Sequence, residues 1–201
     1  MTFGILVMVH CGTPCQSMSW GRLPQLRSWI FVLGLPGLSV GQQALITVGN
    51  ALAQFTVKLC KHLMGYEGRF SIENPCLSWL WAVPGVRDIY AEITTAFTIV
   101  TYKDFGTGYV KPTALLHNLP FGHELWRPPV ELRNPIVLRG WLWFDGQKVA
   151  RTALASRYPP QFAVTLAKLM QKSLDARSAA LAAGGPIPHA LGAFRRRVSS
   201  T

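Results

Sequence analysis

The order of apolar and polar residues predicts strands and helices that alternate along the first half of the chain. The apolar, β-branched run Gly4–His10 predicts a buried parallel strand that feeds a loop. In Gln42–Leu63, large apolar residues recur every three or four positions, which predicts a helix with one buried face. These residues are Leu45, Val48, Leu52, Phe55, Leu59 and Leu63. Arg69–Ile72 predicts a second strand, and strand, helix and strand together predict one right-handed crossover unit.

The second half of the chain predicts further strands and a last helix. Strands are expected at Ala96–Tyr102 and Ala114–Leu116, and Leu138–Phe144 before Asp145-Gly146 predicts one arm of a hairpin. A last helix opens at the Tyr-Pro-Pro of residues 158–160 and carries apolar residues on one side. We therefore expect one α/β domain over residues 1–175, with helices flanking a sheet, and a flexible basic tail over residues 176–201.

The net positive charge of the chain limits the kinds of partner that it can attract. The chain has 20 Lys and Arg against 9 Asp and Glu, a formal net charge of +11, which attracts a polyanion such as nucleic acid or an anionic membrane surface. No apolar run approaches the roughly 18 residues of a spanning helix, and no basic residue precedes the first apolar run as in a secretory signal. We expect an intracellular protein without a membrane partner. Arginines interleaved with tryptophans suit phosphate contacts and base stacking, and they suit a basic surface around a tryptophan-rich core equally well.

Cysteine and histidine spacing predicts no metal site. The cysteines, Cys11, Cys15, Cys60 and Cys76, lack the Cys-x-x-Cys pairs of a zinc site, and the histidines have no ligand spacing. An intracellular domain of this size needs no disulfide. Each thiol is therefore considered on its own.

One loop carries a specific motif directly after the first predicted strand. Residues 12–19 read Gly-Thr-Pro-Cys-Gln-Ser-Met-Ser, which resembles the Gly-x-Pro-Cys-Gln-x-x-Ser loop of cytosine-5 DNA methyltransferases. The resemblance implies that the Cys15 thiolate adds to carbon 6 of cytosine, with Pro14, Gln16 and Ser17 as substrate contacts. The alternative is a simple turn with a small, half-buried cysteine.

A second motif follows one helix later. Residues 70–75 read Phe-Ser-Ile-Glu-Asn-Pro, and their Glu-Asn pair is similar to the pair with which the family grips the target base. The resemblance implies that Glu73 bonds the ring nitrogen and amino group of cytosine, beside Asn74. Taken alone, Glu73 also fits a carboxylate that caps a turn. Two ordered motifs separated by one helix favour the catalytic interpretation.

A third segment matches less closely. Lys103 to Gly106, followed by Lys111, resembles the family's aromatic-glycine turn and its arginine pair for phosphate and base. Lys111 keeps the positive charge, but lysine cannot form the bidentate fork of arginine, so its contacts would be weaker. The pattern is closest to the divergent methylase-like reading frames of phages and mobile elements.

The resemblance also implies what this sequence lacks. The family's S-adenosylmethionine site comes from a first strand and a Gly-rich turn before the Pro-Cys loop, and here only residues 1–13 precede Pro14. We expect a partial Rossmann-like methyltransferase sheet without the first cofactor-binding βαβ unit, incomplete at its N-terminus. The expected function is a cytosine-5 DNA methyltransferase-like domain that is incomplete or inactive alone and needs a complementary cofactor-binding polypeptide. The alternatives are RNA as the target, and a non-catalytic nucleic-acid-binding remnant.

Overall fold

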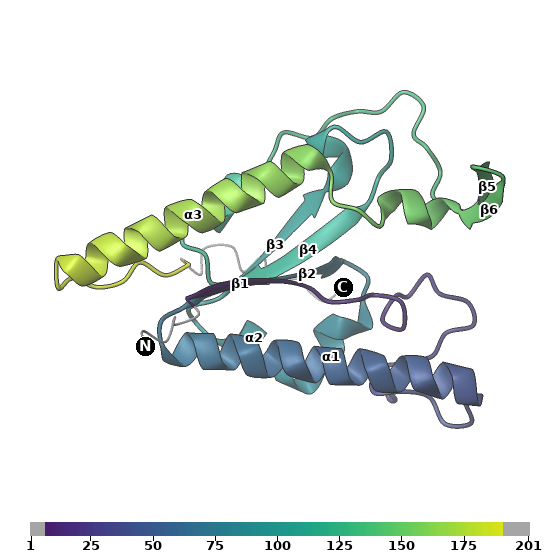
Figure 1. Cartoon of the computed structure of the whole chain (residues 1–201), viewed down its shortest axis with the longest axis horizontal. Helices are drawn as coiled ribbons and strands as arrows, with labels where there is room; N and C mark the ends of the chain where they lie inside the picture. Colours follow the sequence, from purple (N-terminus) through teal and green to yellow (C-terminus); the bar gives the residue numbers. More distant parts are fainter. Residues whose placement is uncertain (1–6, 191–201) are drawn as a thin grey trace, which may run out of the picture.

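The structure, a computed structural model, describes residues 7–190 as a mixed α/β arrangement (Figure 1). The strands are β1 (Met8–Gly12), β2 (Arg69–Pro75), β3 (Ala96–Thr101), β4 (Pro112–His117), β5 (Trp141–Phe144) and β6 (Gln147–Ala150). The α-helices are α1 (Val40–Gly65), α2 (Pro84–Ala91) and α3 (Pro160–Ala182). Short 3-10 helices lie at η1 (Trp79–Ala82), η2 (Tyr102–Phe105), η3 (Gly122–Leu125) and η4 (Arg151–Ala155).

Four strands form one mixed sheet in the order β1-β2-β4-β3. β1 and β2 are parallel neighbours, whereas β4 runs antiparallel to both β2 and β3. β1, β2 and β3 therefore share one direction, and β1 is an edge strand. This confirms an α/β sheet with flanking helices and the strand-helix-strand order expected for β1, α1 and β2. β5 and β6 form the expected hairpin around Asp145-Gly146, separate from the main sheet.

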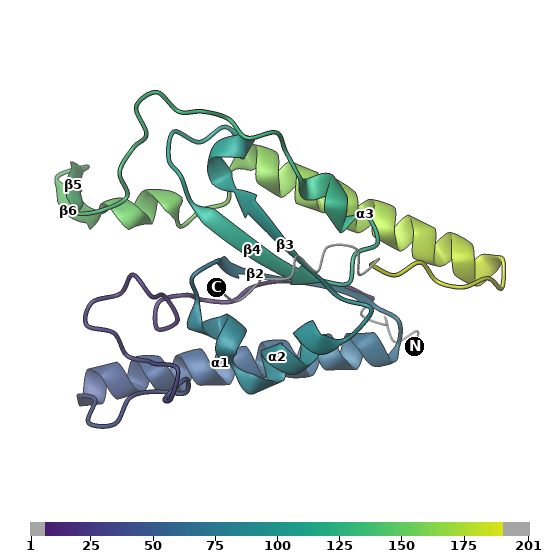
Figure 2. The ribbon, with the colours of Figure 1, turned by 180° about the vertical axis from the view of Figure 1, so that it is seen from behind.

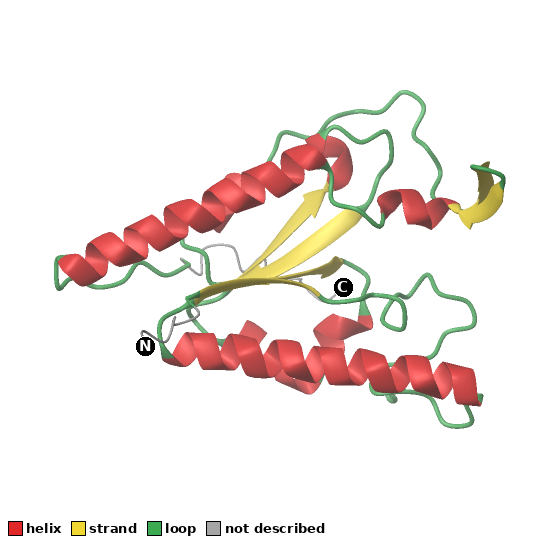
Figure 3. Ribbon diagram, in the orientation of Figure 1, coloured by secondary structure: helices red, strands yellow, loops and turns green. Residues whose placement is uncertain are grey.

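The helices cover both faces of the sheet. Helices α1 and α2 lie side by side on one face, and α3 crosses the other (Figures 1 and 3). The view from behind shows the same layers, with α2 beside α1 (Figure 2). Each face has its own core, one including Ala53, Phe70 and Ile72 and the other including Leu115, Phe162 and Leu166. No helix within residues 7–190 has the length and apolar character needed to cross a membrane.

The buried face of α1 differs from the predicted one. The residues that face the core are Ile46, Gly49, Ala53, Thr56, Cys60 and Leu63. Of the predicted face, Val48 and Phe55 are 58% and 62% exposed, and only Leu63 is fully buried. Small residues let the helix lie close to the segment after β1, where Gly49 faces Ser17 and Thr56 bonds Thr13. The buried stripe is therefore turned from the stripe of large apolar residues. The prediction of the helix was right and that of its face was wrong.

Local chemistry accounts for the ends of α1 and β1. The helix begins two residues before the predicted start because Ser39 and Gln42 form a capping box, each side chain bonding the other residue's backbone N–H. β1 begins at Met8 and reaches Gly12, later than the predicted Gly4–His10. The first three residues of that prediction lie outside the described residues.

The expected flexible tail is ordered over much of its length. α3 continues to Ala182, beyond the expected domain end at residue 175, because its alanine-rich last turns have a high helix propensity. Arg177 donates to the Glu67 and Tyr66 carbonyl oxygens at 3.0 and 3.1 Å. Ile187 and Ala190 are buried. Residues 176–190 therefore pack against the domain, and the basic run Arg195–Arg197 lies outside the described residues.

Candidate active site at the carboxyl ends of β1 and β2

Two parallel strands bring the two sequence motifs together. Gly12 at the end of β1 is in register with Glu73 near the end of β2, and Cys15 follows three residues later. The Cys15 thiol and the Glu73 carboxyl group are close enough to interact electrostatically, and both interact with Lys111. Cys15, Glu73 and Lys111 thus form one cluster, called here the thiol-carboxyl site.

The loop that carries Cys15 is tied to β2. The Cys15 carbonyl oxygen accepts from the backbone N–H groups of Met18 and Ser19 at 3.0 and 2.9 Å, which makes a tight turn. Asn74 donates from Nδ2 to the Thr13 carbonyl oxygen at 2.5 Å and is 1% exposed. Asn74 therefore holds the Cys15 loop against the strand that carries Glu73.

Glu73 is buried and held by two phenols. Tyr102 donates its hydroxyl proton to Oε1 at 3.2 Å, and Tyr158 donates to Oε2 at 3.1 Å. Burial raises the pKa of the Glu73 carboxyl group, while Lys111 and the two tyrosine hydroxyls oppose the increase. A raised pKa makes the protonated form of the carboxyl group easier to reach, and that form can donate a hydrogen bond to a bound base.

Cys15 is half-buried, and its environment favours the neutral thiol. Burial raises the pKa of the Cys15 thiol, Lys111 lowers it, and Glu73 raises it. The contribution of Glu73 disappears when its carboxyl group is protonated, because only the carboxylate repels a thiolate. The protonated state of Glu73 therefore favours the nucleophilic state of Cys15.

Lys111 supplies the positive charge of the site. Its Nζ lies 4.7 Å from the centroid of the Tyr102 ring and donates to the Ala155 carbonyl oxygen at 2.9 Å. A cation over an aromatic face is stabilised by the ring quadrupole. Lys111 is thus fixed by the protein while its charge acts on Cys15 and Glu73.

The three remaining predicted site residues lie on the α1 side of the loop. Pro14, Gln16 and Ser17 border a pocket of about 190 Å³ whose other wall is α1, from Gly41 to Leu52. Ser17 differs most from the prediction, because it is buried and its hydroxyl oxygen accepts from Arg27 Nη2 at 3.1 Å. Arg27 Nε also donates to the Ser17 carbonyl oxygen at 2.9 Å. Ser17 therefore supports the loop, whereas Pro14 and Gln16 are exposed.

No family model, curated protein or solved structure matches this chain. The chemistry of the site therefore has to follow from its own residues.

Sequence reasoning missed three residues of the site. Tyr102 and Tyr158 hold Glu73, and His10 bonds the Tyr158 hydroxyl through Nε2 at 2.9 Å. One local sign of these contacts is present in the sequence: a polar residue, His10, lies inside the apolar run just before Cys11 and Gly12. Gly12 belongs to the same group, since a Cβ at its position would lie 2.7 Å from the Tyr158 hydroxyl oxygen.

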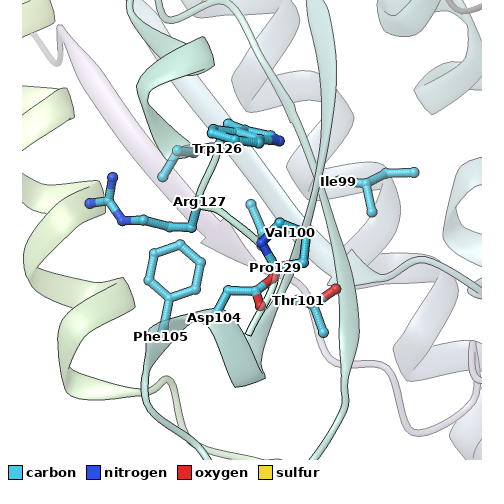
Figure 4. Close-up of a pocket in the computed structure, with 9 residues that line it drawn as sticks. Ile99, Val100, Thr101, Asp104, Phe105, Trp126, Arg127 and Pro129 are labelled. Atoms are coloured by element: carbon cyan, nitrogen blue, oxygen red, sulfur yellow. The ribbon is translucent and has the colours of Figure 1, made fainter. Parts of the chain in front are cut away.

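The described residues do not fit S-adenosylmethionine. The pocket beside the Cys15 loop is lined by apolar and small residues together with Gln16 and Ser17, and it contains no carboxylate for a ribose. Within residues 7–190, no three His, Cys, Asp or Glu side chains gather as metal ligands. A further pocket, of about 110 Å³, lies between β3 and η3 and includes neither Cys15 nor Glu73 (Figure 4).

Proposed function

We propose that the chain is a cytosine-5 methyltransferase-like domain in which Cys15 adds to carbon 6 of a cytosine gripped by Glu73. The observation that supports this most is the meeting of two separate motifs at adjacent ends of parallel strands. Either motif alone fits an ordinary turn. Together they bring a thiol and a carboxyl group close enough to interact electrostatically.

The proposed chemistry is a reversible addition to the pyrimidine ring. The Cys15 thiolate forms a bond from Sγ to carbon 6, and the electron pair of the ring double bond moves toward the ring nitrogen. The Glu73 carboxylic acid gives its proton to that nitrogen, so no buried negative charge develops on the base. Carbon 5 is then electron-rich, and loss of the thiolate with return of the proton restores cytosine.

The methyl donor is proposed to come with another polypeptide, since the described residues do not fit S-adenosylmethionine. β1 is an edge strand, and the Arg69 backbone N–H donates to the Val7 carbonyl oxygen. The backbone groups of successive residues in a strand point to opposite sides, so the N–H and C=O groups of Met8 and His10 point away from β2. Such an edge pairs readily with a further strand. The complementary cofactor-binding polypeptide would then extend a partial Rossmann-like methyltransferase sheet.

The exposed apolar stripe of α1 supports the same place for this polypeptide. α2 packs on one flank of α1, where the Lys61 ammonium group bonds the Asp88 carboxylate at 3.0 Å. Val48, Leu52 and Phe55 lie on the opposite flank and are exposed. Among the described residues, no strand pairs with the outer edge of β1. This edge and the apolar stripe of α1 lie on the same side, which fits a second α/β unit.

Charge and exposed aromatic residues support nucleic acid as the substrate. The β5–β6 hairpin carries Trp141 and Trp143, which are 62% and 75% exposed, and Lys148 lies 5.6 Å from the Trp141 ring centroid. Both views put the hairpin at the same end of the molecule as the Cys15 loop (Figures 1 and 2). Aromatic and basic side chains suit stacked bases and phosphates. DNA is the proposed target, with RNA as the alternative.

The test traps the covalent adduct without any methyl donor. A DNA oligonucleotide with a 2-pyrimidinone base, whose carbon 6 is more electrophilic than that of cytosine, is incubated with the chain and analysed by denaturing gel and mass spectrometry. We expect an adduct that Cys15→Ser abolishes and Glu73→Gln reduces. Cys76→Ser is the matched control, because Cys76 is also half-buried and close to Glu73.

A second candidate function is nucleic-acid binding without chemistry. The observation in its favour is that burial raises the pKa of the Cys15 thiol, which leaves little thiolate at neutral pH. It predicts no adduct, together with DNA binding whose affinity and salt dependence are the same in Cys15→Ala. An adduct that depends on Cys15 would rule it out.

A further inference from the structure

The Glu73 carboxyl group is one end of a line of hydrogen-bonded side chains that connects β2, Tyr158 and β1. Tyr158 donates to Glu73 Oε2 at 3.1 Å, and His10 Nε2 lies 2.9 Å from the Tyr158 hydroxyl oxygen. His10 Nδ1 lies 2.7 Å from Ser71 Oγ. The rings of His10 and Tyr158 also pack edge to face, with centroids 5.5 Å apart. The four side chains thus form a continuous line of donors and acceptors.

The direction of this line is fixed while Glu73 is ionised. The phenol has one proton, and it goes to the carboxylate, so the phenol oxygen accepts from His10 Nε2–H. Burial lowers the pKa of His10 to about 4, so the imidazole is neutral at pH 7 and carries one N–H. Nδ1 then has no proton and accepts from the Ser71 hydroxyl. The ionised carboxylate therefore selects the Nε2–H tautomer of His10.

Protonation of Glu73 reverses the line. When no base is bound, a carboxylic acid at Oε2 donates to the Tyr158 oxygen, Tyr158 donates to His10 Nε2, and His10 donates from Nδ1 to Ser71. The imidazole loses its Nε2 proton and gains one at Nδ1 by exchange with solvent. The line gains one proton in total, the one that Glu73 takes up. No other group changes its charge.

We propose that His10 is a positioning residue for Glu73, and that through Tyr158 its tautomer is tied to the protonation of the Glu73 carboxyl group. The inference rests on the proposed function, because a carboxyl group that exchanges a proton with a base needs a fixed orientation in both states. His10 touches no reacting atom. It keeps Tyr158 bonded to Glu73 in both protonation states of the carboxyl group.

Several neighbouring groups interact with this line and could affect its titration with pH. Glu73 interacts with Lys111, Cys15 and Cys76, and Tyr158 interacts with Cys11. Burial raises the pKa of Cys15 and raises that of Cys76 to about 11, so these two thiols stay neutral while Glu73 titrates. Within the line itself, Glu73 changes its charge and His10 changes its tautomer.

Nuclear magnetic resonance tests the coupling on the whole chain. The imidazoles are labelled with nitrogen-15 and the glutamate carboxyl groups with carbon-13, and His10 and Glu73 are assigned by His10→Gln and Glu73→Gln. We expect His10 to change from the Nε2–H to the Nδ1–H tautomer as the pH falls, with the same midpoint as the Glu73 carboxyl signal. The doubly protonated imidazole, which forms at still lower pH, has its own nitrogen shifts.

Three variants decide the result. Glu73→Gln cannot ionise and should give a tautomer that no longer depends on pH over this range. Tyr158→Phe should leave Glu73 titrating while the His10 tautomer no longer follows it. Tyr102→Phe is the matched control, because Tyr102 donates to Oε1 and not to the His10 branch, so the coupling should persist.

A His10 tautomer that stays constant through the Glu73 midpoint would overturn the proposal. Coupling that survives in Tyr158→Phe would overturn it as well, and Glu73→Gln gives a separate decision if Tyr158→Phe does not fold. The measurement involves no substrate. An adduct without coupling therefore refutes the role of His10 alone, and coupling without an adduct refutes the proposed addition chemistry alone.

Discussion

Cys15 is governed by two neighbours whose effects on its pKa have opposite signs. Glu73 raises the pKa of the thiol and Lys111 lowers it. We predict that Glu73→Gln moves the midpoint for alkylation of Cys15 to lower pH, and that Lys111→Gln moves it to higher pH. The rate of Cys15 carbamidomethylation, followed by mass spectrometry from pH 6 to pH 10, measures both shifts.

The control for these shifts is Arg127→Gln. Arg127 is also basic, but it packs over the Phe105 ring at 5.7 Å and borders the other pocket. Its removal should leave the alkylation midpoint of Cys15 unchanged. Equal shifts in Lys111→Gln and Arg127→Gln would mean that the general positive charge of the protein acts on Cys15, and not Lys111 in particular.

A side chain at position 12 is predicted to displace Tyr158. An added Cβ would lie 2.7 Å from the Tyr158 hydroxyl oxygen, so Gly12→Ala forces Tyr158 away from Glu73. We expect a loss of about 1–3 kcal/mol in the free energy of unfolding, measured by urea denaturation. In the Tyr158→Phe background the loss should be smaller, because the clashing oxygen is gone.

Gly41→Ala is the matched control for this substitution. Gly41 lies in the first turn of α1, and nothing lies within 4 Å of the Cβ that alanine would add. Alanine there should stabilise the chain by up to about 1 kcal/mol. A cost for Gly12→Ala that is the same with and without the Tyr158 hydroxyl would contradict the steric explanation.

The site could be predicted from the sequence where its residues are neighbours in a motif. Cys15 and Glu73 were predicted as the nucleophile and the base-binding carboxyl group, and the structure brings them together. Tyr158 is 85 residues from Glu73 and 148 from His10 along the chain, so no local sequence pattern predicts that these residues are in contact. Such contacts depend on how α3 packs against the sheet.

At the scale of elements, α1 shows why a helix is easier to predict than its orientation. Its apolar spacing predicted a helix correctly, yet its large residues mark an exposed stripe and small ones mark the core. A 3.6-residue period predicts that a helix has an apolar face, but it does not predict whether the protein core or a partner covers that face. α3 shows a related limit, because a run of small residues was taken for a tail and continues the helix.

The exposed stripe of α1 gives a prediction of its own. Phe55 is 62% exposed, so Phe55→Ser should change the free energy of unfolding by less than about 0.5 kcal/mol. Ile46, 1% exposed, faces the core, and Ile46→Ala should cost about 2–5 kcal/mol. Denaturation in urea compares the two variants. A large cost for Phe55→Ser would mean that the predicted buried face was right after all.

At the scale of the whole molecule, the buried His117 and the half-buried His10 make the free energy of unfolding depend on pH. Burial lowers the pKa of both His10 and His117 from 6.5 to about 4. Between these values the unfolded chain binds more protons than the folded one, so stability falls as the pH falls from 6.5 to 4. Glu73, whose pKa is raised, acts in the opposite direction.

We predict that His117→Gln removes on the order of 3 kcal/mol of this pH dependence, because burial lowers the pKa of the fully buried His117 from 6.5 to about 4. The free energy of unfolding, measured in urea at pH 7.5 and pH 4, gives the difference. A pH dependence in His117→Gln as steep as that of the unchanged chain would contradict the prediction.

The β5–β6 hairpin has a consequence for proteolysis. Most of residues 126–151 are exposed, and trypsin recognises the exposed Arg139 and Lys148 and the half-buried Arg151 among them. A first cut there would leave α3 bound to the sheet through Phe162 and Leu166, so Tyr158 would still reach Glu73 in the nicked protein. Bound nucleic acid that stacks on Trp141 and Trp143 would shield the same bonds. The rate of cleavage at these bonds thus reports substrate binding and needs no catalysis.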